Sequence, residues 1–144
     1  MNLGDILKQK GHGTITVGPS TPVSDAIRLM SERRVGSVMV VSADGEALGI
    51  FTERDVLNLL AAKGEGAGTV PVENVMTRKL VVAEPSTKID QTLAAMTENR
   101  CRHMPVLNEG QVLGVISIGD LVKAKLEEAE FEVESLREYI SSGY

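Results

Sequence analysis

The sequence has few aromatic residues: they make up 3% of the 144 residues, and tryptophan is absent. Proteins that hold single-stranded nucleic acid stack its bases on exposed aromatic rings, so this composition argues against such a platform. The net charge of -5 gives no general attraction to nucleic acid or to an anionic membrane. We therefore expect neither nucleic acid nor a membrane among the partners of the protein.

Cysteine, histidine and long apolar runs are also scarce. The single cysteine, Cys101, allows no internal disulfide and no cysteine-rich zinc site, which fits a reducing compartment. The two histidines lack the spacing of a metal-binding motif, and no apolar run is long enough to cross a bilayer. The first residues also lack the apolar region of a signal peptide. These absences predict a cytoplasmic protein without a metal site.

The sequence does contain an internal repeat in an otherwise ordinary globular composition. Hydrophobic residues make up 42% and charged residues 24% of the chain, as in folded domains. The second half copies the first at an offset of 66 residues, which becomes 65 after a turn. The matched pairs include Pro19 and Pro85, Met30 and Met96, Gly45 and Gly110, Gly49 and Gly114, and Asp55 and Asp120. Repetition of this kind indicates two copies of one structural unit.

Each copy has the pattern of a β-α-β-β-α unit. The expected strands lie at residues 14–17, 38–41 and 47–51 in the first copy and at 80–83, 104–107 and 112–116 in the second. Thr21 and Thr87 are suited to cap the first helix of each copy, and the second helices should begin near Glu53 and Ile118. One such unit cannot cover its own sheet. We therefore expect an α/β (α+β) fold in which two repeats pack with pseudo-twofold symmetry and form two similar clefts.

The repeat also predicts the organisation of the chain. The expected parts are a first repeat at 5–63, a glycine-rich linker at 64–72, a second repeat at 73–124 and a helical extension at 125–144. In the extension, apolar residues recur at intervals of four and three, the spacing of a heptad seam: Val122, Leu126, Ala129, Val133, Leu136 and Ile140.

Two interpretations of this seam are open. It is shorter than the three to four heptads typical of a free-standing coiled coil, so the helix could fold back on its own domain. The alternative is self-association of two chains. We favour self-association, because Phe131 and Tyr139 lie off the seam and add a second apolar strip.

The strand-to-helix junction of each copy carries the first candidate site. Thr52 and Asp55 in the first copy, and Ser117 and Asp120 in the second, place a hydroxyl and a carboxylate three residues apart at a helix start. An ionised aspartate there can accept hydrogen bonds from a ribose diol, beside free backbone N–H groups. The same pattern is also a capping box, which satisfies the helix end without any ligand.

A basic segment before the middle strand of the second copy is the next candidate. Arg102 and His103 bring positive charge to a strand end, where a phosphate could be held, and Lys79 adds a further cation. Pro105 leaves one strand position without an N–H, so Met104 and its neighbours could hold a flat heterocycle. The alternative is a solvated basic edge that discourages strand-to-strand aggregation.

The segments 35–55 and 101–120 together resemble CBS domains, which are named for cystathionine β-synthase. Over residues 5–124 the tandem resembles a stand-alone CBS pair, or Bateman module. The resemblance implies binding of an adenosine nucleotide such as AMP, ATP or NAD in the cleft between the repeats. It implies that Asp55 and Asp120 hold ribose beside Thr52 and Ser117. The remaining positions implied to contact the nucleotide are Thr16, Gly36, Val38, Arg54, Lys79, Val82, Arg102, His103, Met104 and Pro105.

The first copy departs from the family pattern. Gly36 and Ser37 stand where the second copy has Arg102 and His103, and Arg54 stands where it has a glycine. We therefore expect the two clefts to differ in affinity, with the second copy the better site for a monophosphate.

The function expected from these features is regulatory rather than catalytic. We expect a homodimeric ligand-sensing module, with no catalytic residues and no obligatory cofactor, that acts in trans on a regulated protein. The rival hypothesis is a structural dimerisation scaffold whose nucleotide clefts are vestigial.

Overall fold

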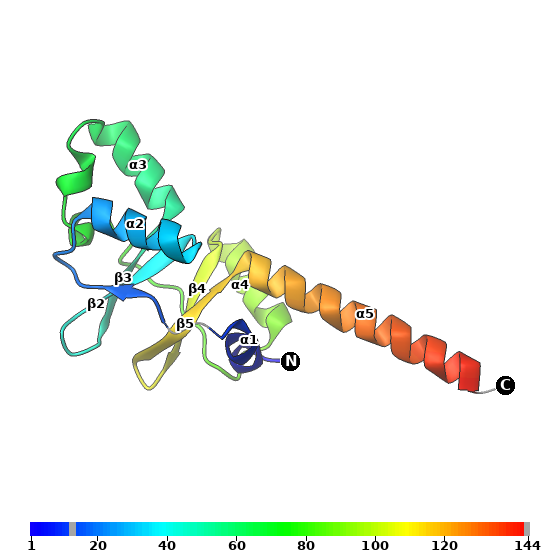
Figure 1. Cartoon of the computed structure of the whole chain (residues 1–144). Helices are drawn as coiled ribbons and strands as arrows, with labels where there is room; N and C mark the ends of the chain where they lie inside the picture. Colours follow the sequence, from blue (N-terminus) through cyan, green and yellow to red (C-terminus); the bar gives the residue numbers. More distant parts are fainter. Residues whose placement is uncertain (12–13, 143–144) are drawn as a thin grey trace.

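The two repeats are visible in the order of secondary-structure elements. The computed structural model describes residues 1–11 and 14–142, so the last two residues of the expected extension lie outside it. The elements are α1 (Leu3–Lys10), β1 (Thr16–Val17), α2 (Val23–Arg33), β2 (Ser37–Val41), β3 (Ala47–Thr52), α3 (Glu53–Lys63), η1 (Ala67–Thr69), η2 (Val72–Asn74), α4 (Ile89–Asn99), β4 (His103–Asn108), β5 (Gln111–Ser117) and α5 (Ile118–Ser142). The mixed α/β architecture and the long C-terminal helix are confirmed (Figure 1).

The sheets of the two repeats differ in their first strand. In the first repeat β1 runs parallel to β2, and β2 pairs antiparallel with β3. In the second repeat β4 pairs with β5, and the strand expected at 80–83 is reduced to a single bridge from Ala83 to Val106. The full-strand prediction is therefore wrong for this copy.

A proline explains the missing strand. In the first repeat the backbone N–H of Met39 donates to the Ile15 carbonyl at 3.1 Å. The equivalent of Met39 in the second repeat is Pro105, which has no N–H to donate. Only the two bonds of Ala83 then remain, one to the Pro105 carbonyl and one from the N–H of Leu107.

The helix starts also differ slightly from the sequence prediction. α2 and α4 begin one residue later than a threonine cap would require, with Pro22 and Lys88 at the N-cap positions. Thr87 instead closes the preceding turn, because its Oγ1 accepts the backbone N–H of Glu84 at 3.1 Å. The assignment of Thr21 and Thr87 as helix caps is therefore wrong.

The hydrophobic interior consists of two clusters, and each contains a segment from beyond its own repeat. Leu3 and Ile6 of α1 are buried in the cluster of the second repeat, with Met96, Met104 and Leu121. The cluster of the first repeat likewise includes Val72 and Met76, which lie where the linker meets the second repeat. The leading segment of each repeat thus completes the core of the other one.

Two matched glycines accommodate these exchanged segments. A side chain at Gly114 in β5 would begin 2.7 Å from a methyl of Leu7, and one at Gly49 in β3 would begin 2.7 Å from the sulfur of Met76. These reciprocal contacts are those expected of pseudo-twofold packing. They also explain why both copies carry glycine at this position of the repeat.

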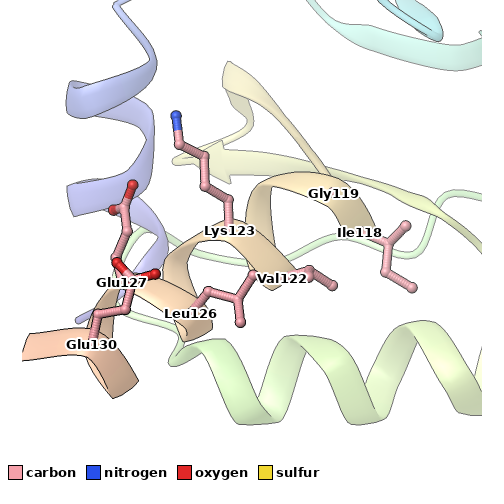
Figure 2. A pocket seen from close by; sticks show the side chains of 7 residues that line it. All are labelled: Ile118, Gly119, Val122, Lys123, Leu126, Glu127 and Glu130. Carbon is pink, nitrogen blue, oxygen red and sulfur yellow. The ribbon is translucent and has the colours of Figure 1, made fainter. Parts of the chain in front are cut away.

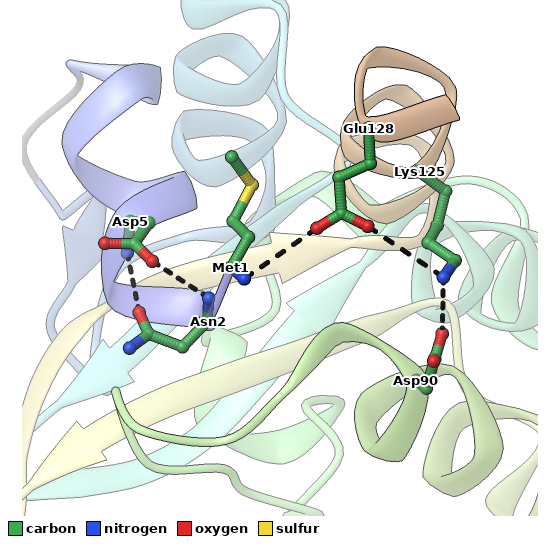
Figure 3. Close-up of polar contacts among 6 residues, drawn as sticks. All are labelled: Met1, Asn2, Asp5, Asp90, Lys125 and Glu128. Carbon is green, nitrogen blue, oxygen red and sulfur yellow. Dashed lines mark hydrogen bonds and ion pairs between the residues drawn. The ribbon is translucent and has the colours of Figure 1, made fainter. Parts of the chain in front are cut away.

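The contacts that anchor the long helix α5 lie near its beginning. Leu121 and Ala124 are buried in the second cluster, and Lys125 lies 2.9 Å from Asp90 of α4 (Figure 3). On the other side, Glu128 lies 3.8 Å from the amino group of Met1. Beyond this anchor the helix extends away from both repeats (Figure 1). The interpretation in which it folds back on its own domain is therefore wrong.

Candidate functional site

A cleft of about 200 Å³ lies where the two repeats meet. It is lined by Leu7, Lys10, Thr14, Ile15, Arg33, Arg34, Val35, Gly36, Ser37, His103, Gly114, Val115, Ser117 and Asp120. The lining comes from α1, from the end of α2 with the beginning of β2, and from β4, β5 and the start of α5. The cleft is therefore built from the leading segment and from both repeats.

The carboxylate of Asp120 stands at the beginning of α5. Its Oδ2 accepts the backbone N–H of Ser117 at 2.9 Å, and the Ser117 Oγ accepts the N–H of Asp120 at 3.1 Å. The capping arrangement considered from the sequence is therefore present. Lys10 also donates to Oδ2 at 2.9 Å and to the Val115 carbonyl at 3.1 Å. Since both donors to the carboxylate, Lys10 and the Ser117 N–H, use Oδ2, Oδ1 is the oxygen to which a ligand hydroxyl would donate.

These contacts set the ionisation of Asp120. Burial by itself raises the pKa of this carboxyl group, but the hydrogen bonds from the Ser117 backbone and from Lys10 outweigh it and hold the pKa below its ordinary value. The side chain is therefore ionised at neutral pH and can act only as an acceptor of hydrogen bonds.

His103, the first residue of β4, lines the same cleft as Asp120, and its backbone is paired with Ser117 of β5. Its imidazole approaches the first repeat, since a side chain at Gly36 would begin 2.9 Å from Nε2. Burial is the main cause that lowers the pKa of His103; Lys10 and Arg102 also lower it, and Glu53 and Asp120 oppose them. The ring is therefore neutral at pH 7.

We expect mild acidification to destabilise the protein through His103. Because its pKa is lower in the folded chain than its ordinary value of 6.5, the unfolded chain takes up this proton first as the pH falls. Stability should therefore fall as the pH drops through about 6.5 toward the lower folded pKa. Urea denaturation at about pH 7.5 and about pH 5.5 measures this loss. In His103→Gln the loss should be smaller; an equal loss would assign the effect to other groups.

The equivalent aspartate of the first repeat is bound differently. Asp55 Oδ2 accepts the backbone N–H and the hydroxyl of Thr52, at 2.9 and 3.2 Å. Its Oδ1 accepts the hydroxyl of Thr77 at 3.0 Å. Both oxygens of Asp55 thus have protein donors, so this carboxylate offers a ribose fewer free acceptor positions than Asp120 does.

The other residues implied by the resemblance are spread over several environments. The cleft at Asp120 brings together four of them: Gly36, His103, Ser117 and Asp120. Five others are exposed outside its lining: Thr16, Arg54, Lys79, Val82 and Arg102. The side chains of Val38, Met104 and Pro105 are buried, so a ligand could meet these positions only through the backbone.

Five polar residues of the cleft were not among the predicted site residues: Lys10, Thr14, Arg33, Arg34 and Ser37. Lys10 arrives because α1 packs into the second repeat, and Thr14 follows it, with its hydroxyl donating to the Leu113 carbonyl at 2.9 Å. Arg33 and Arg34 come from the end of α2 in the first repeat. Arg34 matches Arg100 in the repeat, and pseudo-twofold packing is the signal that could have placed it opposite Asp120.

The described parts of the chain offer little support for a metal site, a cysteine nucleophile or a membrane span. Residues 1–11 and 14–142 contain no cluster of His, Cys, Asp or Glu able to hold a metal ion. Burial raises the pKa of the Cys101 thiol, so it is mainly protonated at neutral pH and is a poor nucleophile. None of the helices within these ranges is long and apolar enough to cross a membrane.

Distant solved structures share this fold and carry adenosine compounds. A CBS domain protein of Pyrobaculum aerophilum, PAE2072, was solved with AMP; it is 19% identical, with a TM-score of 0.74 over 83% of this chain and 89% of that one. The CBS domain pair of protein MJ0100, solved with methylthioadenosine and S-adenosylmethionine, is 21% identical with a TM-score of 0.76 over 86% and 98% of the two chains. At these identities the likeness shows the fold alone.

Closer relatives and a family model agree on the family. Residues 4–62 and 72–127 match the CBS domain model. The mitochondrial CBS domain-containing protein CBSX3 of Arabidopsis thaliana is 35% identical over 99% of this chain and 73% of its own length. The structure of the CBS-domain protein ATU1752 from Agrobacterium tumefaciens is 38% identical, with a TM-score of 0.83 over 87% of this chain and 99% of that one. With its two matched repeats, the chain belongs to the CBS domain family as a tandem pair.

Proposed function

We propose that this CBS pair is a regulatory module that binds an adenosine nucleotide, of the AMP, ATP or NAD type, in the cleft at Asp120. The observation that carries the proposal is the pairing of one ionised carboxylate with several cations in that cleft. Asp120 offers Oδ1 to ribose hydroxyls, while Lys10, Arg33 and Arg34 are suited to bind phosphate. The adenosine compounds in PAE2072 and MJ0100 support this ligand class.

The same cleft offers a route from ligand to output. Lys10 belongs to α1 and Asp120 to the first turn of α5, and the two side chains are joined at 2.9 Å. A phosphate that draws Lys10 away from Asp120 changes the contact between these helices. Such a ligand shifts the protein only by the difference in its affinity for the two arrangements. We propose that the output acts in trans, through a homodimer and a regulated partner protein.

We expect Asp120→Asn to remove most of the thermal stabilisation that a nucleotide gives. A ligand at 100 times its Kd stabilises the folded state by about 2.7 kcal/mol, which a melting curve detects readily. The measurement is the shift in Tm with AMP, ATP, NAD or S-adenosylmethionine, each compared with the same variant without ligand. Asparagine keeps the side-chain size but gives the ribose a weaker acceptor.

The first repeat supplies the matched control. Asp55→Asn changes the equivalent carboxylate, both of whose oxygens already have protein donors. This variant should lower the Tm without ligand and retain the ligand-induced shift. An undiminished shift in Asp120→Asn, or its loss in Asp55→Asn alone, would move the site away from Asp120.

The scaffold alternative has one observation in its favour. Lys10 and the Ser117 backbone both donate to Asp120 Oδ2, so this oxygen has partners within the chain itself. If the cleft is vestigial, no adenine nucleotide changes the Tm. A second experiment distinguishes the two functions. The purified protein is denatured and any released small molecule is identified by mass spectrometry, since only the sensor carries a nucleotide.

A further inference from the structure

From its first turn onward, α5 exposes an apolar stripe. The stripe consists of Val122, Leu126, Ala129, Val133, Leu136 and Ile140, all of which are solvent-exposed. Val133 and Leu136, for example, are 50% and 60% exposed. Within the described residues, no element of the chain covers the stripe, because the helix leaves the body of the molecule after its first turns (Figure 1).

The spacing and residue types of the stripe indicate a helix as its occupant. Intervals of four and three place Leu126, Val133 and Ile140 at heptad positions a, and Val122, Ala129 and Leu136 at positions d. β-branched residues at a combined with leucine at d favour parallel, two-stranded coiled coils. Val133 and Ile140 at a, with Leu136 at d, fit that preference.

The flanking charges select a second copy of this chain in one orientation. In a parallel, in-register pair, each g residue faces the e residue five positions later in the partner helix. Glu132 then faces the partner's Arg137, which is an attractive contact. Lys125, which also pairs with Asp90 of its own chain, faces the partner's Glu130. Two-fold symmetry makes each contact twice.

The antiparallel alternative brings like charges together. When the six apolar layers are aligned antiparallel, e residues face e residues and g residues face g residues. Lys123 then lies beside the partner's Arg137, and Glu132 beside the partner's Glu132. Like charges at such distances are destabilising. The charge pattern therefore distinguishes between orientations that the apolar stripe alone would allow.

At the N-terminal end of α5, the stripe is accessible to a partner helix. The apolar side chains that anchor the helix, Leu121 and Ala124, occupy positions c and f, away from the a/d stripe. A hollow of about 590 Å³ opens at the start of the stripe, bordered by Ile118, Val122 and Leu126 (Figure 2). Gly119 stands at the preceding a position and adds no side chain to the hollow. All the residues that border the hollow belong to α5, so a partner helix that enters here meets this helix.

We propose that two copies of this chain associate through α5 as a parallel, in-register coiled coil over residues 122–140. The helix is already formed and anchored on α4, so association does not include the cost of nucleating it. The dimer holds the two CBS pairs side by side at the same end of the coil. This inference goes beyond the ligand proposal and does not depend on it.

A charge exchange tests both the dimer and its orientation. Glu132→Arg and Arg137→Glu should each weaken dimerisation about tenfold, because each turns two attractive contacts into repulsive ones. The double variant should return the Kd to within about twofold of the wild type, since it restores both contacts in reverse. Sedimentation equilibrium over a range of protein concentrations measures the Kd. An antiparallel dimer would instead be strengthened by Arg137→Glu, which overturns the proposal.

A cysteine at the centre of the stripe gives an independent readout. In a Cys101→Ala background, Ala129→Cys should form an intermolecular disulfide under mild oxidation, because parallel d positions face each other. Phe131→Cys is the matched control: position 131 is a well exposed f position and should remain mainly unlinked. Equal cross-linking of the two variants, or a wild-type chain that remains monomeric at high concentration, overturns the proposal. The shift in Tm with nucleotide is measured on the same samples. The absence of a coiled coil and the absence of nucleotide binding are thus observed separately.

Discussion

Replacing Leu3 with alanine is expected to destabilise the protein by about 3 kcal/mol, although the residue stands near the beginning of the chain. Ends of chains usually fray and tolerate substitution. Leu3, however, is completely buried in the core of the second repeat. Its backbone N–H donates to the Thr87 carbonyl at 3.0 Å, and the capping box between Asn2 and Asp5 holds the start of α1 in place.

Chemical denaturation of Leu3→Ala measures this loss. Leu57→Ala is the matched control, because Leu57 is 68% exposed on α3 and the same truncation there removes little buried surface. We expect the control to change the free energy of unfolding by less than about 0.5 kcal/mol. A similar small change for Leu3→Ala would mean that α1 does not belong to the second core.

Gly49→Ala is also expected to lower the free energy of unfolding by about 3 kcal/mol. The new methyl group would begin 2.8 Å from the carbonyl oxygen of Thr77. That oxygen cannot move aside easily, because Thr77 is tied to Ile50 by two backbone hydrogen bonds of 2.8 and 2.9 Å. The substitution therefore separates the leading segment of the second repeat from β3 of the first. Thermal and urea denaturation measure the expected decrease in Tm and in the free energy of unfolding.

The repeat again provides a comparison at the equivalent position. At Gly114 the close atoms all belong to the Leu7 side chain, which can change its rotamer. Gly114→Ala should therefore cost about 1 kcal/mol, clearly less than Gly49→Ala. If the two substitutions have the same effect, the tight backbone contact at Thr77 is not what requires glycine at residue 49.

Much of the fold was predictable because the repeat and the apolar periodicity are local properties of the sequence. The two internal hairpins, the helices that follow them and the long C-terminal helix were all expected. The first strand of the second copy is shorter than predicted, because Pro105 cannot donate the ladder hydrogen bond that Met39 donates in the first copy. The location of α1 could not be predicted, because it depends on contacts between Leu3 and residues more than eighty positions away.

The sequence predicts those site residues that are close together along the chain. It does not predict the residues that reach the site from distant segments. Ser117 and Asp120 are neighbours on the chain, so their spacing indicated a polar junction. Lys10 and Arg34 reach the same cleft only through the exchange of leading segments and the packing of two repeats. Val38 and Met104 stand on strands whose alternation does not reveal which face becomes core, and both side chains are buried.

The exchange of leading segments also has a consequence for the order of events during protein synthesis. A nascent chain that has emerged only as far as α3 carries the strands of the first repeat but lacks Val72 and Met76, two buried members of its core. The first helix made, α1, must wait still longer, because its binding site includes Leu121 and Ala124. We therefore expect the first repeat of a ribosome-bound chain to become resistant to protease only after Met76 has emerged. We expect α1 to remain cleavable until the beginning of α5, with Leu121 and Ala124, has also emerged.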